Sequence, residues 1–230
     1  MRLLLSAAFI VFASFNAYPG DVSSDVNMPK VLIIGDSISL GYTPYVKQLL
    51  QSEAEVIHIA GNAQSTKFAL KNLDDWIGET KWDAIYFNWG LWDICYRLPP
   101  TDSDPLGKAD KVNGTIATNA DDYEKNLVEL IKKLKQTHAT LIWASTSAVP
   151  EDTSGSFKGD EEKYNRIASS VMQNNEIAIS DLYELTHGFS QELYVGKNDV
   201  HFTKDGYKLI ADKVAKDIRS KLKVNKNLTQ

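Results

Sequence analysis

The sequence predicts an α/β fold, a three-layer α/β/α sandwich built around a five-stranded parallel sheet. Two observations predict this fold. Short apolar runs, typical of buried strands, alternate along the chain with longer segments whose apolar residues recur at helical spacing. Unusual polar residues also follow the ends of several predicted strands, which is where ligands of such sheets bind. No internal repeat or linker divides the chain, so we expect one domain over residues 29–224.

The predicted strands are short and rich in branched apolar residues. The first, over residues 30–34, ends at Gly35-Asp36, which indicates a buried strand with a loop at its carboxyl end. The other strands are predicted over residues 56–59, 84–88, 140–144 and 177–179.

Helical periodicity fills the segments between these strands. In residues 66–77, for example, apolar residues lie at positions 68, 69, 70, 73, 76 and 77. Asp121 or Asp122 can cap a second helix over 123–134. Further helices are predicted over 45–51, 161–173 and 203–222, and long loops over 97–120 and 145–159.

The N-terminus has the features of an export signal. Arg2 precedes an apolar run over residues 3–15 that is too short to cross a bilayer, and Ala17 is a candidate cleavage point. Pro19-Gly20 and a polar stretch follow, which favours a signal over a buried N-terminal helix. We therefore expect a signal peptide over residues 1–20, a mature protein that is periplasmic or secreted, and no membrane span in the mature chain.

Composition narrows the classes of ligand. The chain of 230 residues is 43% hydrophobic and 24% charged, as folded domains are, and its net charge of −5 argues against a nucleic-acid partner. Cys95 is the only cysteine, so no intramolecular disulfide forms; we interpret it as a small buried side chain rather than a nucleophile, because no base adjoins it. Metal-ligand motifs and phosphate-binding loops are missing from the sequence, so we expect no metal or cofactor. Composition does not indicate an oligomeric state.

Ser37 is the first candidate for chemistry. It follows the first predicted strand directly, where a serine hydroxyl is held in place near a helix N-terminus. The alternative is that Asp36 and Ser37 only cap the following turn. A reactive serine needs a base, and among the four histidines His201 alone stands in a loop just before a helix.

These segments resemble a known family. Gly-Asp-Ser-Ile-Ser at 35–39, with Val-His-Phe-Thr at 200–203 and Asp-Gly-Tyr at 205–207, resembles the SGNH hydrolases, also called GDSL esterases, over about residues 31–222. The resemblance implies their flavodoxin-like fold, with Ser37 as nucleophile and His201 as general base. It also implies an oxyanion hole that includes the backbone N–H of Ser37.

The resemblance leaves the other oxyanion donors open. The second donor is a backbone N–H after the second strand, from Gly61 or Ala63. The third is an asparagine in a block that reads Gly-x-Asn-Asp, but here Trp92 stands at the asparagine position, before Asp93. Asn88 is the substitute donor that we expect, and a branch of the family with Asn-x-Gly-Leu-x-Asp is similar to this sequence.

The acid of the triad is a second departure. The family places an aspartate three residues before the histidine, and Asn198 occupies that position. Either Asp199 orients His201 from two residues away, or the enzyme is a Ser-His dyad whose histidine is held by Asn198 or a backbone carbonyl. We favour Asp199.

The residues expected to contact substrate are Asp36, Trp89, Trp92 and Asp93. With Tyr96, the two tryptophans offer aromatic surface to a sugar ring or an acyl chain, although each is as consistent with packing under the long loop. We expect a serine esterase that hydrolyses short acyl esters, chiefly acetyl, on a small molecule or carbohydrate. The alternatives are a lysophospholipase or thioesterase of the same family, and an inactive carbohydrate-binding protein on this fold.

Overall fold

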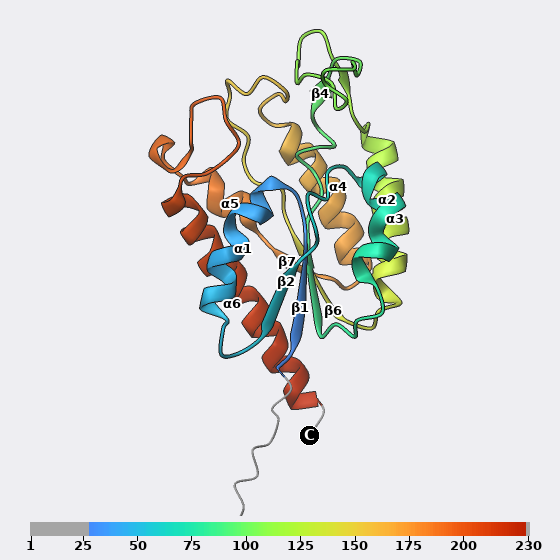
Figure 1. Ribbon diagram of the computed structural model, residues 1–230, viewed down its shortest axis with the longest axis vertical. Coiled ribbons are helices and arrows are strands. Elements are labelled where there is room, and N and C mark those ends of the chain that lie inside the picture. Colours follow the sequence, from blue (N-terminus) through green and yellow to red (C-terminus); the bar gives the residue numbers. More distant parts are fainter. Residues whose placement is uncertain (1–27, 229–230) are drawn as a thin grey trace, which may run out of the picture.

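A computed structural model describes residues 28–228, with side chains described over residues 28–222. Its centre is a parallel sheet in the order β2-β1-β3-β6-β7 (Figure 1). The predicted signal peptide lies outside the described residues. The strands are β1 (Lys30–Ile34), β2 (Glu55–His58), β3 (Ala84–Phe87), β6 (Thr140–Ala144) and β7 (Ala178–Ser180).

Helices cover both faces of this sheet, which confirms the three-layer prediction (Figure 1). On one face α1 packs against α6, and α5 lies beside α6. On the other face α2 packs against α3, and α3 packs against α4. The helices are α1 (Ser37–Leu49), α2 (Thr66–Ile77), α3 (Ala120–Lys135), α4 (Asp160–Asn174), α5 (Leu182–His187) and α6 (Lys204–Leu228), with a 3₁₀ turn, η1 (Gln191–Leu193).

The prediction for the first helix, 45–51, is wrong at its start. Helix α1 begins at Ser37, because the carboxylate of Asp36 accepts a hydrogen bond from the Ile38 N–H at 3.0 Å and caps the helix. Pro44 lies inside this helix. Helix α5 was not predicted, since its six residues are too few to show a period.

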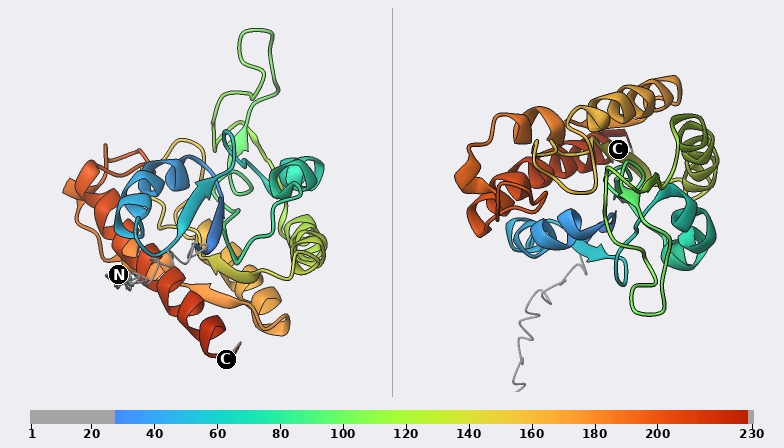
Figure 2. Two further views of the ribbon diagram at one scale, coloured as in Figure 1. Left: turned by 60° about the horizontal axis from the view of Figure 1, so that its bottom comes forward. Right: turned by 90° about the horizontal axis from the view of Figure 1, so that it is seen from above.

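The predicted loop over 97–120 is partly ordered as a small antiparallel sheet. Strand β4 (Tyr96–Arg97) pairs with β5 (Thr115–Ile116), and Arg97 also forms a bridge with Ala109. The loop between β4 and β5 projects from the body of the molecule in both views of Figure 2.

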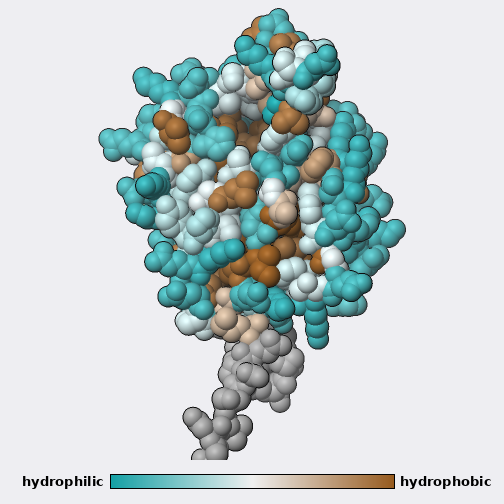
Figure 3. Space-filling model, viewed as in Figure 1, coloured by the Kyte–Doolittle hydropathy of each residue, from teal (hydrophilic) through white to brown (hydrophobic). Residues whose placement is uncertain are grey.

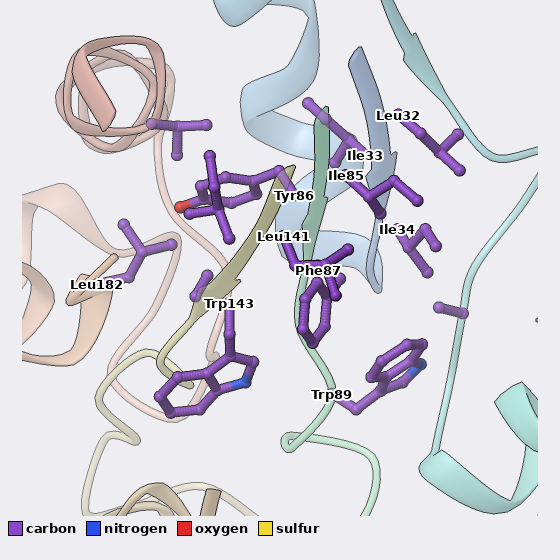
Figure 4. Packing of buried hydrophobic residues seen from close by; sticks show 14 of the residues in the cluster. Leu32, Ile33, Ile34, Ile85, Tyr86, Phe87, Trp89, Leu141, Trp143 and Leu182 are labelled. Atoms are coloured by element: carbon purple, nitrogen blue, oxygen red, sulfur yellow. The ribbon is translucent and has the colours of Figure 1, made fainter. Parts of the chain in front are cut away.

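The hydrophobic core holds the ends of the strands in place. The four residues of β3 are all fully buried, and beyond them the ring of Trp89 packs on Phe87 at 5.6 Å between centroids (Figure 4). Trp143 at the end of β6 is also fully buried. These side chains make the carboxyl edge of the sheet a rigid platform for the loops that follow.

Candidate active site

Ser37 occupies the first turn of α1, directly after the carboxyl end of β1. It is half-buried, and the positive end of the helix dipole lies beneath it. Asp36 beside it is almost fully buried, and its Oδ2 atom has no hydrogen-bond partner among the described residues. Burial raises the pKa of Asp36, with the hydrogen bond from Ile38 acting in the opposite direction.

A chain of hydrogen bonds joins Ser37 to an acid through His201. The Ser37 hydroxyl lies 2.8 Å from Nε2 of His201, and Nδ1 of the same ring lies 2.6 Å from Oδ1 of Asp199. A carboxylate only accepts hydrogen bonds, so Nδ1 carries the proton and Nε2 is free to accept the one from Ser37. Ser37 and His201, 164 positions apart in sequence, are therefore brought into one catalytic arrangement.

Asp199 reaches the ring because the loop turns sharply. Its Oδ1 also accepts the backbone N–H of His201 at 2.9 Å, and its own N–H donates to the carbonyl of Gly196. Partial burial raises the pKa of Asp199, but hydrogen bonds from the backbone and ring of His201 outweigh it and hold the pKa below its usual value. Asn198 is exposed and makes no hydrogen bond to this ring, whose two nitrogens face Asp199 and Ser37.

Aromatic packing fixes the loop that carries His201. Phe202, the next residue, is buried against Tyr194 and Tyr207, with ring centroids 4.8 and 5.7 Å away. Tyr207 packs on α1 at Gly41, where an added Cβ would lie 2.2 Å from the tyrosine ring. Contact between α1 and α6 at this glycine sets the position of His201 relative to Ser37.

The candidate oxyanion donors differ in what their N–H groups do. The backbone N–H of Ala63 donates to the carbonyl of Gly35 at 2.9 Å, so it is already paired. Gly61 is exposed, has a φ of +80°, and its N–H makes no hydrogen bond within the described residues. Asn88 donates through Nδ2 to the carbonyl of Ala144 at 2.7 Å and more weakly to the Thr146 hydroxyl at 3.4 Å.

Two of the expected substrate contacts, Trp89 and Asp93, are buried and do not line the cavity that holds Ser37 and His201, which corrects the sequence-based expectation. Trp89 is 1% exposed and part of the core. Asp93 is fully buried and accepts hydrogen bonds from the backbone N–H and the hydroxyl of Thr66, which connects the loop after β3 to the start of α2. Burial raises the pKa of Asp93 to about 6, although the hydrogen bonds from Thr66 act to lower it. Both residues support the site without facing a ligand.

A cavity of about 280 Å³ opens above Ser37 and His201. Asp36, Trp92 and Asp199 also line it, and so do two features that sequence reasoning missed, Arg97 and the segment 153–156. Their only signal in the sequence was a polar composition, which surface loops share. Figure 3 shows this region beside the lobe formed by the loop between β4 and β5, where the surface is hollowed.

A larger hollow, of about 420 Å³, lies between α4 and the β7–α5 segment. It holds none of the predicted site residues, so the smaller cavity is the candidate active site. Within the described residues, no group of three or more His, Cys, Asp or Glu side chains could hold a metal ion. In the same part of the chain, no helix is both long and apolar enough to cross a membrane.

A parallel α/β sheet with a serine, a histidine and a carboxylate aligned at its carboxyl edge defines the class of α/β hydrolytic enzymes. A family model, GDSL-like lipase/acylhydrolase, matches residues 31–214. The chain belongs to this family, and it is a carboxylic ester hydrolase. A comparison with curated proteins found no match.

Solved structures of esterases share the fold. The acetyl xylan esterase AlAXEase is 20% identical with a TM-score of 0.66, and the match covers 82% of this chain and 99% of that one. The lipase/acylhydrolase from Enterococcus faecalis is 18% identical with a TM-score of 0.68, over 84% and 96% of the two chains. A catalytic mutant of Axe2, an acetylxylan esterase from Geobacillus stearothermophilus, is 17% identical with a TM-score of 0.63, over 83% and 94%.

Proposed function

We propose that this protein is an exported serine esterase that removes short acyl groups, chiefly acetyl, from a carbohydrate. The observation that carries the proposal is the hydrogen-bonded chain from Asp199 through His201 to Ser37. All three residues line one cavity. In this proposal Ser37 is the nucleophile, His201 the general base and Asp199 the residue that orients and stabilises the imidazole.

The reaction proceeds in two steps. Ser37 Oγ attacks the acyl carbon as its proton passes to Nε2 of His201, and the imidazolium then protonates the departing alcohol. The acyl group remains as an ester on Ser37. His201 next takes a proton from water as the water oxygen attacks the acyl carbon. The bond between the acyl carbon and Ser37 Oγ then breaks, the imidazolium returns its proton to Oγ, and the acid is released. Asp199 stabilises the imidazolium in both steps.

The negative oxygen of each tetrahedral intermediate needs donors that are free to bind it. The backbone N–H groups of Ser37 and Gly61 meet this requirement better than that of Ala63, which is paired with Gly35. Asn88 can add a third donor, because the weaker of its two hydrogen bonds, at 3.4 Å, leaves one amide proton easily redirected.

A short acyl group and a sugar fit the character of the cavity. Its volume is small, and its walls combine the indole of Trp92 with the hydroxyls of Thr153, Ser154 and Ser156. Two structural neighbours are acetyl xylan esterases, in keeping with this substrate class. Another is a lipase/acylhydrolase, which makes a lysophospholipase or thioesterase the second candidate.

Hydrolysis of 4-nitrophenyl esters tests the proposal. We expect the purified protein to hydrolyse the acetate fastest, with kcat/KM falling as the acyl chain lengthens, and Ser37→Ala to lose activity. Faster hydrolysis of long-chain esters would favour the second candidate, whereas no hydrolysis of any ester or acetylated sugar would favour a binding protein. The matched control is Ser190→Ala, at an exposed serine outside the cavity.

Export is proposed from residues 1–20 alone. Expression of the full sequence in a bacterium and N-terminal sequencing of the product tests it. A product that begins near residue 18 in the periplasm or medium supports export, and an intact N-terminus in the cytoplasm contradicts it.

A further inference from the structure

Arg97 lies on the wall of the cavity that holds Ser37 and His201, and the fold fixes its position. It belongs to β4, pairs there with Thr115 of β5, and forms a second bridge with Ala109. Its Nη1 donates to the carbonyl of Gly107 at 2.8 Å. The guanidinium is therefore held in one place before any ligand arrives.

The positive charge of this guanidinium has no counter-charge. Within the described part of the chain no carboxylate lies within 4 Å of it, and its Nε is buried with no hydrogen-bond partner. Burial raises the pKa of the neighbouring Cys95 thiol despite the guanidinium, so the sulfur stays neutral. The ring of Trp92, whose centroid lies 4.5 Å from Cζ, attracts the cation weakly. A partly buried charge with no partner costs folding free energy, and a ligand of opposite charge would offset that cost.

The acids of the cavity are both engaged elsewhere. The carboxylate of Asp199 accepts two hydrogen bonds from His201, and that of Asp36 caps α1. Among the residues that the structure describes, Arg97 is the only lysine or arginine that lines the cavity. Arg97 is therefore the cationic side chain that an anionic group on a substrate in this cavity would bind.

The rest of that wall carries hydroxyl groups. Segment 153–156 supplies Thr153, Ser154 and Ser156, and its backbone is bonded to β4 through the Tyr96 N–H and the Gly155 carbonyl, 2.6 Å apart. A guanidinium, an indole face and several hydroxyls in one cavity match a sugar ring that bears a carboxylate.

We propose that Arg97, with Trp92 beside it, binds a carboxylate on the alcohol part of the ester, so that the preferred substrate is an acylated acidic sugar. The proposal rests on the esterase function proposed above and adds its substrate class. Arg97 determines which substrates are preferred, whereas Ser37 and His201 carry out the hydrolysis.

Paired probes of equal shape test the selectivity. The two are 4-acetoxybenzoate and its neutral counterpart 4-acetoxybenzamide, and the readout is the ratio of their kcat/KM values. We expect the wild type to favour the anion by roughly tenfold or more, which is the effect of one charge-assisted hydrogen bond. Arg97→Gln is expected to bring the ratio close to one and Arg97→Lys to keep part of the preference. The control Arg166→Gln, at an arginine outside this cavity, is expected to keep the full ratio.

A purely structural role for Arg97 would lower both values equally and leave the ratio unchanged, which would overturn the proposal. A wild-type ratio near one would overturn it as well. Binding to Ser37→Ala protein, measured by calorimetry with oligogalacturonate and neutral xylo-oligosaccharide, separates this inference from the catalytic one. Tighter binding of the acidic oligosaccharide supports the Arg97 subsite even if no ester is hydrolysed, and equal or weaker binding contradicts it.

Discussion

Replacing Asp199 by Asn removes a charge while keeping the shape of the side chain, and the structure predicts how the amide will sit. Oδ1 of Asp199 accepts two N–H groups, one from the backbone of His201 at 2.9 Å and one from its ring at 2.6 Å. An amide oxygen can accept both, whereas an amide nitrogen can accept neither. The oxygen is therefore expected to keep its place, and the imidazole its tautomer.

The expected loss then comes from charge alone. A hydrogen bond to a charged group contributes about 1.5–3 kcal/mol, and a neutral one about 1 kcal/mol. The difference is roughly 0.5–2 kcal/mol, with the lower part favoured because the Asp199 side chain is 39% exposed. At about 1.4 kcal/mol per tenfold change in rate, kcat/KM is expected to fall by roughly 2- to 30-fold.

The assay is steady-state hydrolysis of 4-nitrophenyl acetate by wild type, Asp199→Asn, Asp199→Ala and Asn198→Ala. Asp199→Ala is expected to lose more than Asp199→Asn, because the ring loses its support, and Asn198→Ala to lose less than about threefold in kcat. A loss of about 10⁴-fold in Asp199→Asn, the size expected for the wrong tautomer, would refute the reasoning about the amide. A loss below twofold in Asp199→Ala would show that the enzyme works as a dyad.

Four other substitutions have expected outcomes. Trp89→Ala is expected to reduce the free energy of unfolding by about 3–5 kcal/mol in urea titrations, because the ring is a core residue; an unchanged midpoint would contradict its burial. Asp93→Asn should remove a pH dependence of the folding stability. Because the pKa of Asp93 is raised to about 6 in the folded protein, protonated Asp93 contributes stability below about pH 4 that is lost as the pH rises through about 6. The urea midpoint of the wild type should therefore fall relative to that of the variant between those two pH values. Asn88→Ala is expected to lower kcat by roughly 10²-fold, and a twofold effect would mean that the third oxyanion donor lies elsewhere. Gly41→Ala should destabilise the fold by about 1–3 kcal/mol and lower activity, because the new methyl meets the Tyr207 ring; unchanged melting and activity would show that the helices simply move apart.

The spacing of apolar residues predicted the bounds of those strands and helices whose formation depends mainly on that spacing. Strands 30–34 and 140–144 and helix 66–77 have the bounds expected from their apolar residues. Helix α1 was predicted to begin eight residues late, because the stretch before Tyr45 contains glycine, threonine and Pro44, which are poor helix formers. The cap from Asp36 and packing against α6 outweigh that local tendency.

The site required information that no local pattern holds. Whether an aspartate two residues before His201 can reach its ring depends on the turn at Gly196, which the sequence does not reveal. The aromatic and acidic residues after β3 have the same sequence signature whether they face the cavity, as Trp92 does, or the core, as Trp89 does. Arg97 lay in a segment predicted as surface loop, and only the pairing of β4 with β5 brings it to the cavity.

Covalent labelling is the most direct test of Ser37 as the nucleophile. The protein is treated with a 4-nitrophenyl alkylphosphonate, which phosphonylates an activated serine, and the adduct is located by peptide mass spectrometry. We expect one adduct per chain, on the peptide that contains Ser37, with none in Ser37→Ala and slower labelling in His201→Ala. Stoichiometric labelling of another residue, or labelling that persists in Ser37→Ala, would contradict it.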